Sequence, residues 1–175
     1  MIALRKTSAR VSLLLVMLWG CAAPDEPLTH NDPSRYALAA NVPWSAPEGF
    51  DLSMDIYTPR SGKASYPVLV IFHGGGWLIN DKSIMDQAAK YLVSNGEYVV
   101  CNVDYRLLGD QGNSVTLNEI VNDAFGAVLW VKDNIANYGG DPDRVALTGD
   151  SAGAHLAAAV VNLGPNLSIN GRGSI

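Results

Sequence analysis

The sequence is poor in the residues that build disulfides, metal centres and nucleic-acid surfaces. Its 175 residues include two cysteines, three histidines and 12 Lys or Arg against 17 Asp or Glu, giving a net charge of −5. No cluster of His, Cys, Asp and Glu has metal-ligand spacing, and no basic stretch suits nucleic acid. The glycine-rich stretches lack the lysine of a phosphate-binding loop and the spacing of a dinucleotide fingerprint. We therefore expect no metal, no cofactor and no nucleic-acid partner.

The first 20 residues have the pattern of an export signal. Basic residues precede an apolar run over 11–19, which is too short to span a bilayer as a mature helix, and small residues follow it. Residues 18–21 also resemble a bacterial lipoprotein signal, in which the cysteine is acylated and becomes the new N-terminus. We expect a signal peptide over 1–20, a lipid on Cys21 as the only membrane contact, and a periplasmic or outer-membrane location. Plain secretion is the alternative.

Residues 21–48 are polar, rich in proline and without sustained periodicity, so they are expected to form a tether. A catalytic domain is expected over 49–164, followed by an irregular tail over 165–175. Cys101 lies inside an apolar run and is expected to be a small buried residue without a disulfide.

Strand patterns alternate with helix patterns along the expected domain. Apolar residues alternate with polar ones over 52–56, as in a half-buried strand. Residues 68–72 are an uninterrupted apolar run and 98–103 are another buried-strand pattern, as expected of central strands. Helical spacing of apolar residues occupies 84–94 and 117–135. This order predicts an α/β fold with a doubly wound, mostly parallel sheet, in which active sites lie beyond the carboxyl ends of the strands.

One stretch, over 145–156, combines a strand, a sharp turn and a helix around a serine. The Gly-x-Ser-x-Gly spacing falls on Gly149, Ser151 and Gly153. A strand that reverses into a helix within one residue leaves no room for side chains beside the serine, so both flanking positions need glycine. The turn also presents the hydroxyl at the positive end of the helix. We predict that Ser151 is a nucleophile; an ordinary helix N-cap is the alternative.

A second glycine-rich bend follows the strand at 68–72. It reads His-Gly-Gly-Gly-Trp over residues 73–77. Glycines let backbone N–H groups turn toward a substrate oxygen, and the N–H of Ala152, just after the serine, points at the same place. Since both bends follow strands, we expect them to meet and form an oxyanion hole.

These motifs resemble those of α/β-hydrolases of the hormone-sensitive-lipase and carboxylesterase type, close to the small bacterial esterase, lipase and feruloyl-esterase-like group. The segments that carry the resemblance are 55–59, 73–77, 104–107, 138–142 and 149–155. The resemblance covers residues 50–164, which correspond to the front half of such a domain.

The resemblance implies hydrolysis of carboxylic esters through an acyl-enzyme on Ser151. It assigns Gly75 and Gly76 as oxyanion donors and Gly74 to the shape of the turn. It also implies that His73 braces the loop and is not the catalytic base. The substrate would be a small-molecule ester or, by analogy, an ester linked to a polysaccharide.

The triad acid and base of such enzymes follow the serine in sequence. Residues 152–175 contain no Asp or Glu and one histidine, His155, which lies one helical turn past Ser151 and is expected to be structural. Asp150 precedes the serine and is expected to anchor a loop. We therefore expect a truncated hydrolase without its C-terminal strands, inactive on its own. Alternatives are a non-catalytic surface lipoprotein and a prolyl-oligopeptidase-type peptidase, which usually lacks the His-Gly-Gly-Gly loop.

Overall fold

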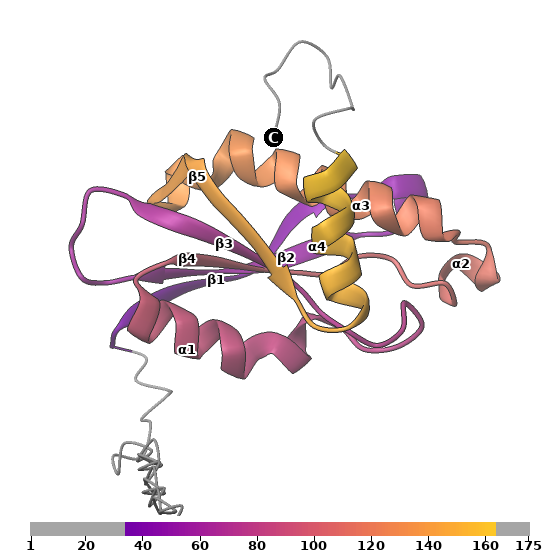
Figure 1. Ribbon diagram of the computed structural model, residues 1–175, viewed down its shortest axis with the longest axis horizontal. Coiled ribbons are helices and arrows are strands. Elements are labelled where there is room, and N and C mark those ends of the chain that lie inside the picture. Colours follow the sequence, from indigo (N-terminus) through magenta and orange to yellow (C-terminus); the bar gives the residue numbers. More distant parts are fainter. Residues whose placement is uncertain (1–33, 164–175) are drawn as a thin grey trace, which may run out of the picture.

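A mixed sheet lies at the centre of the molecule, between helices (Figure 1). The computed structural model describes residues 34–163. Its strands are β1 (Tyr36–Ser45), β2 (Leu52–Pro59), β3 (Tyr66–Phe72), β4 (Val99–Val103) and β5 (Gly140–Gly149). Its α-helices are α1 (Asp86–Gly96), α2 (Asp110–Asn113), α3 (Leu117–Asn134) and α4 (Ala152–Leu163). Short 3-10 turns occupy Pro47–Gly49, Lys82–Met85 and Ile135–Tyr138.

The strand order is β1-β2-β4-β3-β5. Strand β3 pairs in parallel with β4 and β5, while β2 pairs antiparallel with both β4 and β1. The predicted α/β class is confirmed, with a sheet that is parallel on the β5 side and antiparallel on the β1 side. Because β3 and β5 are parallel, their carboxyl ends lie at the same edge of the sheet. The residues after Phe72 and after Gly149 therefore start side by side.

Strand β1 corrects the prediction of a tether over residues 21–48. Residues from Tyr36 to Ser45 lie in the sheet, where Tyr36 pairs with Pro59 and Val42 with Met54. Most of their side chains are exposed or half-buried, and apolar and polar residues do not alternate as they would in a half-buried strand. The signal peptide predicted over 1–20, the lipid on Cys21 and the tail over 165–175 lie outside the described residues.

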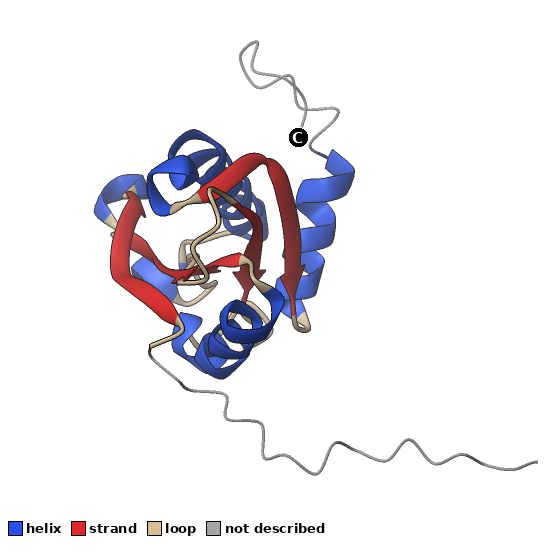
Figure 2. Cartoon of the chain, turned by 90° about the vertical axis from the view of Figure 1, so that its left-hand side faces the viewer, coloured by secondary structure: helices blue, strands red, loops and turns tan. Residues whose placement is uncertain are grey.

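Two apolar clusters cover the two faces of the sheet, and Figure 2 shows the helices on both sides of it. The larger cluster packs α3 and α4 against the strands, with fully buried residues such as Ile120, Val128 and Leu156. The smaller cluster packs Ala89 and Val93 of α1 on the other face. Among residues 34–163, none of the helices is long and apolar enough to cross a membrane.

Helix α3 begins with a complete capping box. The Thr116 hydroxyl accepts from the N–H of Glu119, and the Glu119 carboxylate accepts from the N–H of Thr116 at 2.8 Å. Reciprocal bonds of this kind satisfy N–H groups that a helix start leaves without partners. On β4, Cys101 is fully buried as predicted, and burial raises the pKa of its thiol. A thiol in that setting is inert.

Candidate active site

Ser151 lies on a tight turn between β5 and α4. Strand β5 ends at Gly149 and α4 begins at Ala152. The φ of Ser151 is 48°, in the left-handed region that residues other than glycine seldom adopt. The N–H of Gly153 donates to the carbonyl of Asp150 at 2.7 Å and so fixes the turn. The Ser151 residue is exposed. This strand–turn–helix elbow is the geometry that the sequence predicts for a nucleophile.

The elbow leaves no space for a side chain at either flanking glycine. A Cβ on Gly149 would lie 2.5 Å from the carbonyl oxygen of Phe72, and a Cβ on Gly153 would overlap the same oxygen. The predicted need for glycine at both positions is therefore confirmed. Its cause is the close approach of the end of β3 as well as the turn itself.

The glycine-rich loop over residues 73–77 contacts the elbow directly. The N–H of Gly74 donates to Oδ1 of Asp150 at 2.6 Å, and a Cβ on Gly74 would lie 2.9 Å from Cγ of the same carboxylate. Gly75 and Gly76 have φ values of 126° and 63°, which glycine adopts readily. The two bends thus meet as predicted, and Asp150 is the loop anchor that joins them.

His73 is buried beneath this loop. Its Nδ1 donates to the carbonyl of Gly74 at 2.8 Å, which places the proton on that nitrogen because a carbonyl only accepts. The imidazole stacks on Tyr105 with ring centroids 4.3 Å apart and planes 11° apart. The Tyr105 hydroxyl in turn donates to the carbonyl of His73 at 2.5 Å. These contacts fit the role that the resemblance implies for His73, which is to hold the loop in place. They add Tyr105 as a supporting residue, which the sequence pattern did not single out.

His155 is exposed on α4 and lies against the glycine-rich loop. Its ring meets the indole of Trp77 edge to face, with centroids 5.3 Å apart and planes at 82°. The structural role expected for His155 is thus an aromatic contact between α4 and the loop. The backbone N–H of His155 donates to the carbonyl of Ser151 at 3.2 Å, as in any helical turn. Within residues 34–163, neither the His73 nor the His155 imidazole hydrogen bonds to the Ser151 hydroxyl, and no group of three or more His, Cys, Asp or Glu could hold a metal ion.

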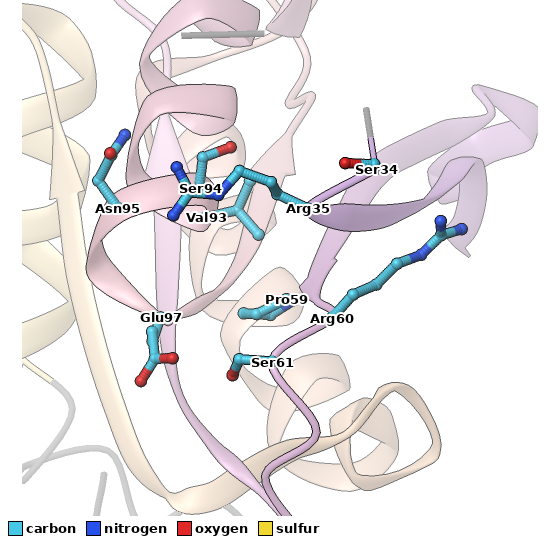
Figure 3. Close-up of a pocket in the computed structure, with 9 residues that line it drawn as sticks. All are labelled: Ser34, Arg35, Pro59, Arg60, Ser61, Val93, Ser94, Asn95 and Glu97. Atoms are coloured by element: carbon cyan, nitrogen blue, oxygen red, sulfur yellow. The ribbon is translucent and has the colours of Figure 1, made fainter. Parts of the chain in front are cut away.

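Two pockets lie at opposite edges of the sheet, and one of them is next to Ser151. One, of about 420 Å³, lies next to the elbow along β5 and α4, where Leu147, Gly149 and Ala157 are among its lining residues. Another, of about 470 Å³, lies where β2 ends and β1 begins, at the edge of the sheet opposite to Ser151 (Figure 3). In that pocket the side chain of Arg60 points away from that of Arg35, so its positive charges do not converge.

A strained serine elbow joined to a glycine-rich loop at the carboxyl edge of parallel strands defines an α/β-hydrolase. The family model BD-FAE matches residues 54–172, and the chain belongs to this family.

Solved structures with a similar fold are esterases. The carboxylesterase EstE1 from a metagenomic library aligns with a TM-score of 0.64 and 34% identity, over 74% of this chain and 42% of that chain. An esterase of Pyrobaculum calidifontis aligns with a TM-score of 0.64 and 30% identity, over 73% of this chain and 39% of that chain.

Similar curated proteins are also hydrolases of esters or related compounds. The carboxylesterase NlhH of Mycobacterium tuberculosis is 34% identical over 65% of this chain and 34% of its own length. Phenmedipham hydrolase of Pseudarthrobacter oxydans is 36% identical over 62% of this chain and 22% of its own length. The chain therefore spans about a third or less of these relatives.

Proposed function

We propose that this protein is a carboxylic ester hydrolase in which Ser151 attacks the ester carbonyl and forms an acyl-enzyme. The observation that carries the proposal is the hydrogen bond between Gly74 and Asp150, because it holds the glycine-rich loop beside the serine. The exposure of Ser151 and its left-handed backbone support the same assignment. Esterases among the similar structures and curated relatives point to the same chemistry.

The proposed step forms a bond between Ser151 Oγ and the carbonyl carbon and moves negative charge onto the carbonyl oxygen. The N–H groups of Gly75, Gly76 and Ala152 donate to that oxygen, and the N-terminus of α4 adds its positive end. The tetrahedral intermediate then expels the alcohol and leaves the acyl group on the serine. The serine proton needs a base, and the described residues place no histidine on the hydroxyl. We therefore propose that acylation of the 175-residue chain is slow, with water taking the serine proton, that deacylation is slower still, and that the serine is best detected by a single covalent event.

Acylation without rapid turnover gives a stoichiometric burst. With p-nitrophenyl acetate we expect about one equivalent of p-nitrophenol per chain, followed by slow release. A succinyl-peptide p-nitroanilide is expected to give no burst. A burst from the anilide alone would indicate a peptidase of the prolyl-oligopeptidase type. No burst from either substrate would favour an inactive fragment or a non-catalytic surface lipoprotein.

Replacing Asp150 with alanine removes the side chain that joins the two bends. The Gly74 N–H then loses its acceptor and the loop is no longer held against the elbow. Because misplacement by about 1 Å costs as much as about 100-fold, we expect the acylation rate to fall by about 10-fold or more. Asp150→Asn keeps an acceptor oxygen and should retain most of the rate. Stopped-flow measurement of the burst checks both variants, and equal rates for Asp150→Ala and the wild type would contradict the anchoring part.

A further inference from the structure

Lys82, on the segment that follows the glycine-rich loop, is hydrogen-bonded at its backbone and at its ammonium group. Its N–H donates to Oδ1 of Asp104 at 2.7 Å, and its carbonyl accepts from Nδ2 of Asn102 at 2.8 Å. Its Nζ donates to Oδ2 of Asp104 at 2.8 Å, to Oδ1 of Asn41 at 2.9 Å and to Oγ of Ser53 at 3.2 Å. An ammonium has three protons, so these three acceptors satisfy it fully. Lys82 is therefore not free to bind a substrate.

The surroundings of Lys82 keep it charged and in place. Its side chain is 12% exposed, and Asp55 lies 3.9 Å from its Nζ in addition to Asp104. Burial lowers its pKa, but the hydrogen bond and charge of Asp104, together with the charges of Asp55 and Asp81, outweigh this, so the pKa of Lys82 is raised above its usual value. The ammonium thus joins β1, β2 and the segment after β4 at one point.

Contacts run from this point to the first two residues of the glycine-rich loop, from two sides. On one side, Nδ2 of Asn80 donates to the carbonyl of Gly74 at 3.3 Å, and Asn80 lies two residues before Lys82. On the other side, Asp104 is followed by Tyr105, which holds His73 through its hydroxyl and its ring. The pairing of Lys82 with Asp104 therefore fixes Tyr105, which contacts His73, relative to Asn80, which contacts Gly74.

We propose that Lys82 is a positioning residue, which holds the N–H groups of Gly75 and Gly76 in the orientation that donates to the oxyanion. It acts through Asp104 and Tyr105 on His73 and through Asn80 on Gly74, the two residues that precede these donors. The proposal rests on the proposed function, since the donors matter only if Ser151 is acylated. If Lys82 had only the structural role of holding β1 to β2, replacing it would lower the free energy of unfolding without changing the geometry of the loop.

The variant Lys82→Met tests this, with Lys63→Met as the matched control. Lys63 forms an ion pair with Glu97 in which both side chains are largely exposed, on a different part of the surface. The readout is the rate at which a fluorophosphonate labels Ser151, measured against probe concentration. We expect Lys82→Met to lower the limiting rate by about 10- to 100-fold without changing the half-saturating concentration. Lys63→Met should match the wild type in both. An unchanged limiting rate in folded Lys82→Met would overturn the proposal.

Amide hydrogen exchange separates this proposal from the proposed function, because it needs no reaction at the serine. We expect the amides of Gly75 and Gly76 to exchange about 10-fold faster in Lys82→Met than in the wild type or in Lys63→Met. If wild-type Ser151 is not labelled, the proposed function fails, while the exchange rates still decide on Lys82. If these two amides exchange at the wild-type rate in Lys82→Met, the positioning role of Lys82 is overturned.

Asn80→Gly covers the case in which Lys82→Met does not fold. Asn80 has a φ of 78°, which glycine adopts without strain, so only the side-chain hydrogen bond to Gly74 is lost. We expect the same direction of change in labelling and in exchange. Wild-type values in both measurements would contradict the proposal.

Discussion

Replacing Ser151 with alanine is expected to abolish covalent labelling of the chain by a fluorophosphonate probe. The probe reacts with a serine hydroxyl when backbone donors hold the oxygen on phosphorus, as they would hold an ester oxyanion. The elbow exposes Ser151, and Asp150 keeps the glycine-rich loop against it. Since loss of the nucleophile removes the covalent step itself, we expect the labelling rate to fall by at least about 1000-fold. Intact-mass spectrometry over a time course measures the loss.

The control for this experiment is Ser114→Ala. Ser114 is also exposed, but its hydroxyl donates to the carbonyl of Gln111 and lies on no elbow. This variant should be labelled like the wild type. Labelling of Ser151→Ala at the wild-type rate would place the reactive group elsewhere and would remove the basis for an esterase.

Replacing Asp123 with alanine is expected to destabilise the fold more than any surface change. Asp123 and Arg106 are 6% and 4% exposed. The carboxylate accepts from Nε of Arg106 at 2.9 Å, from its Nη2 at 2.8 Å and from its backbone N–H at 3.1 Å. These hydrogen bonds raise the pKa of Arg106, which stays charged when its partner is removed. Within residues 34–163, the buried guanidinium without Asp123 keeps only Glu119, whose more exposed carboxylate lies 3.6 Å from its Nη1. Removing the buried partner of a buried charge costs about 3–5 kcal/mol in free energy of unfolding. Chemical denaturation at neutral pH measures the change.

Asp141→Asn is the comparison for this prediction. Asp141 pairs with Nε of Arg144 at 2.6 Å, and the Arg144 side chain is 53% exposed. Water screens such a pair, so we expect a much smaller loss than for Asp123→Ala. Equal losses of free energy of unfolding in the two variants would contradict the claim that burial makes the Arg106–Asp123 pair the more stabilising one. Because Arg106 follows Tyr105 directly, Asp123→Ala should also loosen the brace on His73.

The serine elbow and the glycine-rich loop could be predicted from the sequence because each rests on a local motif. Glycines on both sides of Ser151, and three in a row after His73, are required by turns whose backbone leaves no other choice. Strands β3 and β4 could be predicted for the same kind of reason, since a strand buried on both faces is largely apolar.

Strand β1 could not be predicted from its pattern, because it is an edge strand whose side chains face water for most of its length. Its register with β2 also shifts after Ala39, near Asn41, which has a φ of 51°. Strand β5 extends from Gly140, well before the apolar residues at 145–147, through a polar stretch whose pattern indicates a turn.

The residues that hold the glycine-rich loop in place could not be predicted from the sequence, for a different reason. Tyr105 lies 32 residues from His73, and Lys82 lies 22 residues from Asp104. Their hydrogen bonds depend on which strands become neighbours in the sheet, and spacing along the chain carries no information on that. The anchoring role of Asp150 could be predicted because Asp150 is adjacent to the serine. That its partner is the N–H of Gly74 could not be predicted.

The central claim is that two glycine-lined bends converge, so that backbone amides surround the hydroxyl of Ser151. The most direct test is a crystal structure of the chain after reaction with a fluorophosphonate. We expect phosphorus to be bonded to Ser151 Oγ, with one phosphonyl oxygen about 2.7–3.1 Å from the amide nitrogens of Gly75, Gly76 and Ala152. A phosphonyl oxygen that points into solvent, away from all three amides, would contradict the account.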